Sequence, residues 1–184
     1  DQVRSAAILY LEGYLWDPEV PRAAMEAAIG AAREAGRKVA FTLSDTFCVE
    51  RHRDGFHRLL DEKKVDILFA NEAELAAMTG KDEFEAGLAA LSAKAPLLVV
   101  TRSDKGAVAV AGAERAEVPA EPIARLVDTT GAGDLFAAGF LAGQARGLDL
   151  EKSLKLGAIA AAEVIQHYGA RPEKDLKALA GGIL

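Results

Sequence analysis

Short apolar runs of strand length recur along the first half of the chain, and longer stretches with a helical pattern separate them. The runs are residues 6–11, 38–43, 65–70 and 96–101. Near-continuous apolar strands that alternate with helices are typical of βαβ units, in which helices cover both faces of a parallel sheet. The alternation therefore predicts an α/β fold, a three-layer sandwich with a mainly parallel central sheet.

The rest of the pattern predicts a hairpin and a helical last third. Residues 106–111 and 114–118 are expected to pair and to turn at Gly112. Asn71 and Asp82 are each expected to cap a short helix. Further helices are expected over residues 23–35, 50–61, 132–146 and 150–167. No internal repeat or Pro/Ser-rich linker interrupts the chain, so we expect residues 1–184 to form a single domain.

Composition and charge exclude several classes of protein. Hydrophobic residues make up 51% of the chain, which is too apolar for a disordered one. The net charge of −6 argues against binding to nucleic acid, which normally requires a basic face. No apolar run approaches the ~20 residues of a membrane-spanning helix. Cys48 is the only cysteine and cannot form an internal disulfide, so we expect it to be buried in a cytoplasmic protein.

The most informative segment is a glycine loop, Asp-Thr-Thr-Gly-Ala-Gly-Asp at residues 128–134, which leads directly into a predicted helix. The first amides of a helix have no partners within it, and the helix dipole favours negative charge there. Glycine allows the backbone to approach a ligand closely. The loop is therefore suited to hold phosphoryl oxygens, and Asp134 beside them could accept a proton from a hydroxyl group.

This loop has three other interpretations. A P-loop is excluded because the sequence contains no GxxxxGK[ST]. A dinucleotide-binding loop, and with it a nicotinamide dehydrogenase, is disfavoured because Phe136 occupies the third glycine position and the loop opens a late helix. A purely structural helix start remains open for these residues taken alone. Gly139 and Gly143 are interpreted as close-packing positions on the same helix.

The segment DTTGAGDLFAAGFLAG (residues 128–143) resembles the C-terminal signature of the ribokinase-like (PfkB-type) carbohydrate and nucleoside kinases. Further similarities follow the family order. Residues 71–74 (NEAE) resemble its N-x-x-E motif, residues 101–106 (TRSDKG) its T-x-G-x-x-G segment, and residues 167–172 the stretch after its last long helix. The resemblance implies the ribokinase-like fold and an ATP- and Mg²⁺-dependent kinase.

The resemblance also implies roles for individual residues. Asp134 would be the catalytic base, and Gly131, Ala132 and Gly133 would form the anion hole. Asn71 and Glu74 would organise Mg²⁺ and phosphate, partly through water, although the residues alone suggest a helix-capping pair. The nucleotide-binding positions would be Asn71, Thr101, Ser103 and Gly106, where Ser103 stands at a position that is usually glycine in the family.

Two further implied sites concern a monovalent cation and the acceptor. Asp128 and the carbonyl of Thr130 match positions that hold K⁺ in several members of the family, near a loop equivalent to that at Gly169. Two segments, residues 9–14 and 41–47, are similar to the adenosine kinase branch, in which the aromatic matching Phe47 packs on the nucleoside base. Phe47 as a core residue is the alternative. We therefore expect a nucleoside or sugar as the small-molecule partner, and neither nucleic acid nor a membrane.

The resemblance covers only the second half of the family fold, so we expect the N-terminal half and its lid to be missing from this chain. The leading hypothesis is an adenosine kinase-like enzyme, and ribokinase, fructokinase or another PfkB sugar kinase stays open. A non-catalytic nucleotide-binding fragment is the alternative of another class. A homodimer is a further expectation for the full-length protein.

Overall fold

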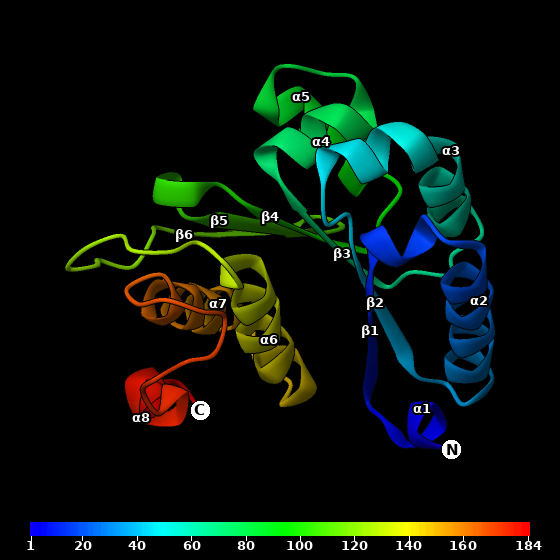
Figure 1. The fold of residues 1–184 in the computed structure, drawn as a ribbon. Helices are drawn as coiled ribbons and strands as arrows, with labels where there is room; N and C mark the ends of the chain where they lie inside the picture. The colour runs from blue at the N-terminus through cyan, green and yellow to red at the C-terminus, as the bar shows by residue number, and fades with distance from the viewer. The chain divides into compact units, whose positions relative to one another are not determined.

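The computed structural model describes residues 1–184, which divide into two compact units. The first unit contains residues 1–100 and 110–114, and the second contains residues 101–109 and 115–184. Hydrogen bonds join six strands in the order β1-β2-β3-β4-β5-β6. The strands are β1 (Ile8–Glu12), β2 (Lys38–Thr42), β3 (Ile67–Asn71), β4 (Leu97–Thr101), β5 (Ala107–Ala111) and β6 (Glu114–Val118) (Figure 1). The predicted α/β class and the predicted hairpin strands are confirmed.

In the first unit, β1, β2 and β3 run parallel and in a register that aligns their ends. Glu12 at the end of β1 pairs with Thr42 at the end of β2, and Thr42 pairs with Phe69 on β3. The residues that follow these strands therefore emerge at one edge of the sheet. In parallel α/β sheets this carboxyl edge is where ligands bind.

Four longer helices follow the strands of the first unit, in addition to a short N-terminal one (Figure 1). They are α1 (Gln2–Ser5), α2 (Glu19–Glu34), α3 (Thr46–Asp61), α4 (Glu72–Thr79) and α5 (Phe84–Ser92). Part of the core beneath them is aromatic: the rings of Phe41 and Phe56 lie 5.1 Å apart and meet edge-on, and Trp16 meets both. Edge-on packing suits the charge distribution of aromatic rings. Cys48 is buried, as predicted.

Three predicted helix starts were wrong, and in two of them a nearby side chain caps the helix at another residue. α2 begins at Glu19 rather than at residue 23 and has no side-chain cap. α3 begins at Thr46 rather than at residue 50, since Asp45 Oδ1 accepts a hydrogen bond of 2.6 Å from the Phe47 amide. α5 is capped by Glu83 rather than by Asp82, because the Glu83 carboxylate accepts from the amides at positions 85 and 86. The prediction used residue type alone, whereas the cap is decided by which side chain reaches the free amides.

The second unit contains α6 (Ala132–Ala145), α7 (Leu150–Val164) and α8 (Leu176–Ala180). α7 ends at Val164 and not at residue 167, so the predicted helix was one turn too long. α6 and α7 pack through glycines: a Cβ added at Gly139 would lie 2.5 Å from Leu156 O, and one at Gly143 would lie 2.6 Å from Ser153 Oγ. The interpretation of both glycines as close-packing positions is confirmed. None of the helices is both long and apolar enough to cross a membrane.

Gly139→Ala is expected to lower the free energy of unfolding by about 2 kcal/mol, because the added methyl group would push against the backbone of α7. Gly30→Ala on α2 is the matched control. A Cβ there would meet nothing within 4 Å, so the better helix propensity of alanine should raise stability by about 0.5–1 kcal/mol. Urea unfolding monitored by circular dichroism measures both changes. Equal effects of the two substitutions would contradict the close contact.

Candidate functional site

The carboxyl edge of the first unit is organised by a reciprocal capping box between Asn71 and Glu74. Asn71 ends β3 and precedes α4. Its Oδ1 accepts from the Glu74 amide at 2.8 Å, while Glu74 Oε2 accepts from the Asn71 amide at 3.0 Å. A third hydrogen bond of 2.7 Å joins Asn71 Nδ2 to Glu74 Oε1. The capping pair expected from the residues alone is confirmed, and both side chains are held in one orientation.

Glu74 is a nearly buried carboxyl group beside two other acids. Glu74 is only 5% exposed to solvent. Burial raises the pKa of Glu74 to about 7; the Asn71 amide opposes this rise, and the negative charges of Asp45 and Glu12 add to it. Loss of hydration disfavours the charged form of a carboxyl group. Glu74 is therefore an acid that can gain or lose a proton near neutral pH.

The raised pKa of Glu74 predicts a measurable dependence of stability on pH. Between the ordinary pKa of 4.5 and the folded-state pKa of about 7, ionisation of Glu74 opposes folding. The stability from the protonated group is fully present below pH 4.5 and is lost as the pH rises through about 7. Glu74→Gln keeps a capping side chain but cannot ionise, so from pH 5 to pH 8 it should gain roughly 2–3 kcal/mol relative to the native chain.

Urea unfolding at several pH values tests this expectation, and Glu50→Gln is the control because Glu50 lies exposed on α3. The control should keep a constant difference from the native chain at every pH. A constant difference for Glu74→Gln as well would show that Glu74 does not titrate in this range.

Three residues at the same edge were not predicted from the sequence: Glu12, Ser44 and Asp45. Ser44 Oγ donates to Glu12 Oε2 at 3.1 Å and accepts from the Gly13 amide at 2.8 Å. Ser44 adopts a left-handed conformation with φ of 66°. The register of β1 and β2 places Glu12 beside the end of β2, just before Ser44. No local sequence motif predicts this contact.

Phe47, in the first turn of α3, is 65% exposed. The alternative that Phe47 belongs to the core is therefore wrong. A flat apolar ring in solvent at the carboxyl edge of the sheet is able to stack on another flat group.

Asn71 and Glu74 fit a magnesium ion that keeps much of its water. Both side chains supply oxygen atoms, the ligand type that Mg²⁺ prefers, and the ion commonly takes only one or two protein carboxylates together with phosphate oxygens. All of their side-chain oxygens already accept hydrogen bonds within the capping box, which suits contact through water. No group of three or more His, Cys, Asp or Glu side chains in the structure could hold a metal ion.

The second unit contains the glycine loop. Gly131 is the residue before α6 and adopts a left-handed conformation with φ of 81°. A Cβ there would lie 2.7 Å from the Cβ of Ala170, whereas a Cβ at Gly133 would meet nothing within 4 Å. Gly131 is thus required because any side chain there would collide with Ala170. The absence of a side chain at Gly133 leaves open space beside the first turn of the helix. No side chain caps the first turn of α6. The Ala132 amide donates to the carbonyl of Thr129 at 3.1 Å, and the amides that follow it in this turn can bind an anion.

Asp134 lies exposed in this first turn of α6, the position that the sequence predicted for it. Asp128 is more closely engaged. Its Oδ1 accepts from the amide and hydroxyl of Thr130 at 2.9 and 2.7 Å, and its Oδ2 accepts from the Gly169 amide at 3.1 Å. These donors hold the pKa of Asp128 below its usual range. The structure thus brings together the two loops, at residues 128–130 and 169, that were expected to surround a monovalent cation.

Thr101, Ser103 and Gly106 surround the turn between β4 and β5. Thr101 ends β4, and Ser103 is exposed with a left-handed φ of 53°, which explains why glycine also suits this position. Gly106 has φ of 92°. A Cβ at Gly106 would collide with the carbonyl oxygen of Val118. Gly106 is therefore required by packing inside the unit, whatever else the turn binds.

A buried carboxylate near the glycine loop was also missed by the sequence analysis. Glu163 on α7 accepts from the amides of Glu173 and Lys174 at 3.1 and 3.0 Å, and its two oxygens lie 3.3 Å from His167 Nε2. Burial opposes a charged imidazole, but the hydrogen bonds to Glu163 and to the Tyr168 carbonyl outweigh it and raise the pKa of His167. Glu163 thereby fastens the segment that follows α7.

The sequence profile described as "pfkB family carbohydrate kinase" matches residues 1–176. A cytidine kinase from Thermococcus kodakarensis is 37% identical over 142 residues, which are 74% of this chain and 50% of that protein. The chain thus spans about half the length of the curated relatives it matches.

Solved structures share the fold over nearly the whole chain. A probable sugar kinase from Rhizobium etli has a TM-score of 0.97 at 44% identity, covering 99% of this chain and 56% of that one. An adenosine kinase from Sinorhizobium meliloti has a TM-score of 0.95 at 45% identity, covering 98% and 55%. A ribokinase from Arabidopsis thaliana, solved with ribose and ATP, has a TM-score of 0.78 at 27% identity, covering 97% and 57%.

Proposed function

Because the chain belongs to the pfkB family of carbohydrate kinases, we propose that it forms the nucleotide-binding and phosphoryl-transfer part of an ATP-dependent kinase that acts on a hydroxyl group of a nucleoside or sugar. The family predicted from residues 128–143 is confirmed, and adenosine kinases occur among the relatives and the solved structures. The observation that carries the proposal is the first turn of α6, which has no side-chain cap, begins after a left-handed glycine and contains an exposed Asp134.

The proposed reaction moves one phosphoryl group and one proton. The acceptor hydroxyl gives its proton to the Asp134 carboxylate while its oxygen bonds to the γ-phosphorus of ATP. The bond from that phosphorus to the bridging oxygen breaks, and ADP leaves. The amides of Gly131, Ala132 and Gly133 are proposed to stabilise the charge on the transferred phosphoryl oxygens.

The other predicted positions are proposed to hold ATP and its metal ion. Asn71 and Glu74 would orient water molecules around Mg²⁺, which supplies charge neutralisation between the phosphates when it is bound. Thr101 and Ser103 would bind nucleotide phosphates at the end of β4, in the turn that Gly106 keeps tight. Support comes from the related ribokinase that was solved with ATP. K⁺ at Asp128 and Thr130 is a further proposal, supported by the hydrogen bond from the Gly169 amide to Asp128.

For the acceptor we propose a nucleoside, adenosine first, with the exposed ring of Phe47 stacked on the base. The similar cytidine kinase and adenosine kinase support a nucleoside, whereas the similar probable sugar kinase supports the second candidate, a free sugar. Residues 1–184 are proposed to act as one functional domain, because the family match extends across both units. A cytoplasmic location and a homodimer of the full-length protein are also proposed.

The deciding experiment measures ADP release by the full-length protein with Mg-ATP and, in parallel, adenosine, cytidine, ribose, fructose and ketodeoxygluconate. We expect adenosine to exceed each free sugar in kcat/KM by about tenfold or more, since a pocket that contacts the base binds the transition state of a nucleoside better. A preference for a free sugar would keep the phosphoryl-transfer proposal and remove the nucleoside. ATP binding without turnover on any acceptor would favour the non-catalytic nucleotide-binding module.

A further inference from the structure

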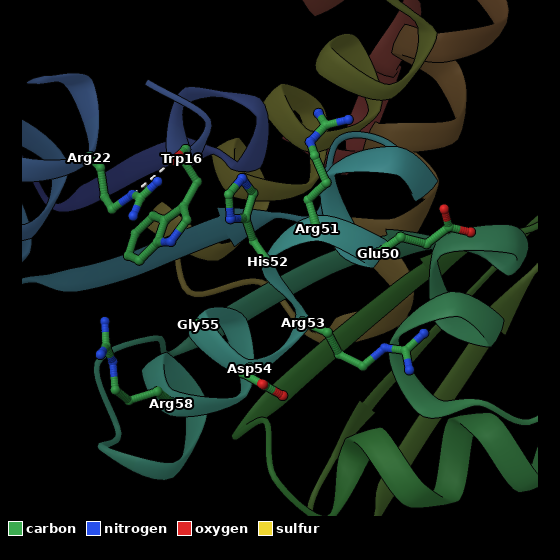
Figure 2. A pocket seen from close by; sticks show the side chains of 9 residues that line it. All are labelled: Trp16, Arg22, Glu50, Arg51, His52, Arg53, Asp54, Gly55 and Arg58. Atoms are coloured by element: carbon green, nitrogen blue, oxygen red, sulfur yellow. Dashed lines mark hydrogen bonds between the residues drawn. The ribbon is translucent and has the colours of Figure 1, made fainter. Parts of the chain in front are cut away.

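A cavity of about 410 Å³ lies against α3 in the first unit, and its wall carries more positive than negative charge. Figure 2 shows the nine residues that line it. Four are arginines, one is a histidine and two are carboxylates, although the whole chain has a net charge of −6. A concave wall with an excess of one charge attracts ions of the opposite sign. The cavity therefore favours an anion.

Trp16 is a nearly buried residue that lines this cavity. The residue is only 2% exposed, and its ring packs edge-on against Phe41 and Phe56. Its backbone carbonyl accepts from Arg22 Nε at 2.9 Å, but its indole N–H donates to no protein acceptor. In Figure 2 the indole nitrogen lies on the side of the ring that faces His52. His57 Nδ1 is the one buried side-chain nitrogen or oxygen that has no partner, so the indole N–H of Trp16 is open to solvent and free to donate to a ligand or a water molecule.

Arg22 and Arg58 supply two of the guanidinium groups that line the cavity. Arg22 lies over the indole ring, with its Cζ 5.9 Å from the ring centroid. Arg58 reaches from α3 toward α2, where its Nη2 is 3.6 Å from Glu26 Oε1. Glu26 is one helical turn beyond Arg22 on α2, so Arg58 approaches the face of α2 that carries Arg22. The contact with Glu26 is long and exposed, and such a pair holds Arg58 only weakly.

Arg51 and His52 both contact Asp17 and are not part of this inference. Asp17 accepts from Arg51 Nη2 at 2.5 Å, and its other oxygen lies 2.6 Å from His52 Nε2. Figure 2 shows the Arg51 side chain pointing away from Trp16. The α3 backbone departs from helical geometry at His52, with φ of −123° and ψ of 17°.

We propose that this cavity binds the phosphate dianion of a small polar molecule, held by Arg22, Arg58 and the indole N–H of Trp16. Guanidinium groups match the geometry of phosphate oxygens and remain charged at every physiological pH. The volume lies within the range of about 300–1,000 Å³ that is usual for small organic ligands, so a phosphate ester fits as well as the free ion. The site is independent of the proposed transfer, since none of its residues has a role in it.

Isothermal titration calorimetry of the full-length protein with ribose 5-phosphate, and separately with inorganic phosphate, tests the proposal in low-salt buffer. Arg58→Gln and Arg22→Gln should each weaken binding by about tenfold or more, since each removes a charge-assisted hydrogen bond. Glu26→Gln should tighten binding by roughly twofold to fivefold, because it frees Arg58 from a competing carboxylate. Arg125→Gln, an exposed arginine of the second unit, is the matched control and should change nothing.

The two ligands distinguish the source of the phosphate: tighter binding of the ester indicates contact with the sugar, and equal binding indicates the phosphate group alone. Either result supports the site if the arginine variants weaken it. Absence of binding for both ligands would overturn the proposal. So would binding that Asp134→Asn or a second-unit variant alters while Arg58→Gln and Arg22→Gln do not, because the ligand would then lie at the glycine loop. Failure of the proposed kinase reaction would leave these titrations unchanged.

Discussion

Asp134→Asn in the full-length protein is expected to lower kcat for phosphoryl transfer by roughly 10²–10⁴-fold, the usual contribution of a general base. Asparagine has nearly the same size and leaves the backbone of the glycine loop intact, but it cannot take the proton of the acceptor hydroxyl. Because Asp134 is exposed at the start of α6 and makes no hydrogen bond that supports the fold, stability should stay nearly constant. ATP affinity should also change little.

Steady-state ADP release with the best acceptor measures this effect, and calorimetry with ATP separates turnover from binding. Asp82→Asn is the matched control, because Asp82 is an exposed aspartate of the first unit that caps no helix. It should keep full turnover. If Asp134→Asn instead lost ATP binding with kcat unchanged, Asp134 would be a nucleotide ligand and another residue would have to be the base.

Gly106→Ala should destabilise the protein by about 3–5 kcal/mol, the largest effect expected for any single methyl group in this chain. The new Cβ would collide with the Val118 carbonyl oxygen and lie 2.8 Å from the Cα of Pro119, and neither backbone atom can rotate away. The φ of 92° at Gly106 adds backbone strain for any residue with a side chain. Urea or thermal unfolding of the purified variant measures the loss.

Gly112→Ala is the matched control for Gly106, because it tests backbone conformation without the collision. Gly112 joins β5 to β6 with φ of 60°, and a Cβ there would meet nothing within 4 Å. We expect a cost of only about 1–2 kcal/mol, which reflects the left-handed conformation. Similar losses for Gly106→Ala and Gly112→Ala would mean that the turn between β4 and β5 relaxes and that packing against Val118 is not the constraint.

The features that the sequence predicted well depend on residues that are close together in the chain. The capping box needs only Asn71 and Glu74, three positions apart, and the start of α6 needs only the glycines before it. The helix boundaries predicted from the sequence were less accurate than these local features. The residues Glu83 and Asp45 compete with their neighbours for the first amides of α5 and α3, and small differences in side-chain reach decide which one caps the helix.

By itself, the sequence determined the α/β class, the family, the capping box and the uncapped glycine loop, because period, caps and turns are set by neighbouring residues. Only the tertiary structure decided the pKa of Glu74, the link from Asp128 to Gly169 and the basic cavity beside Trp16. Each of these requires groups that lie far apart in the chain to meet at a defined distance. Loss of hydration, charge interactions and collisions depend on that distance, and no local pattern of residues specifies it.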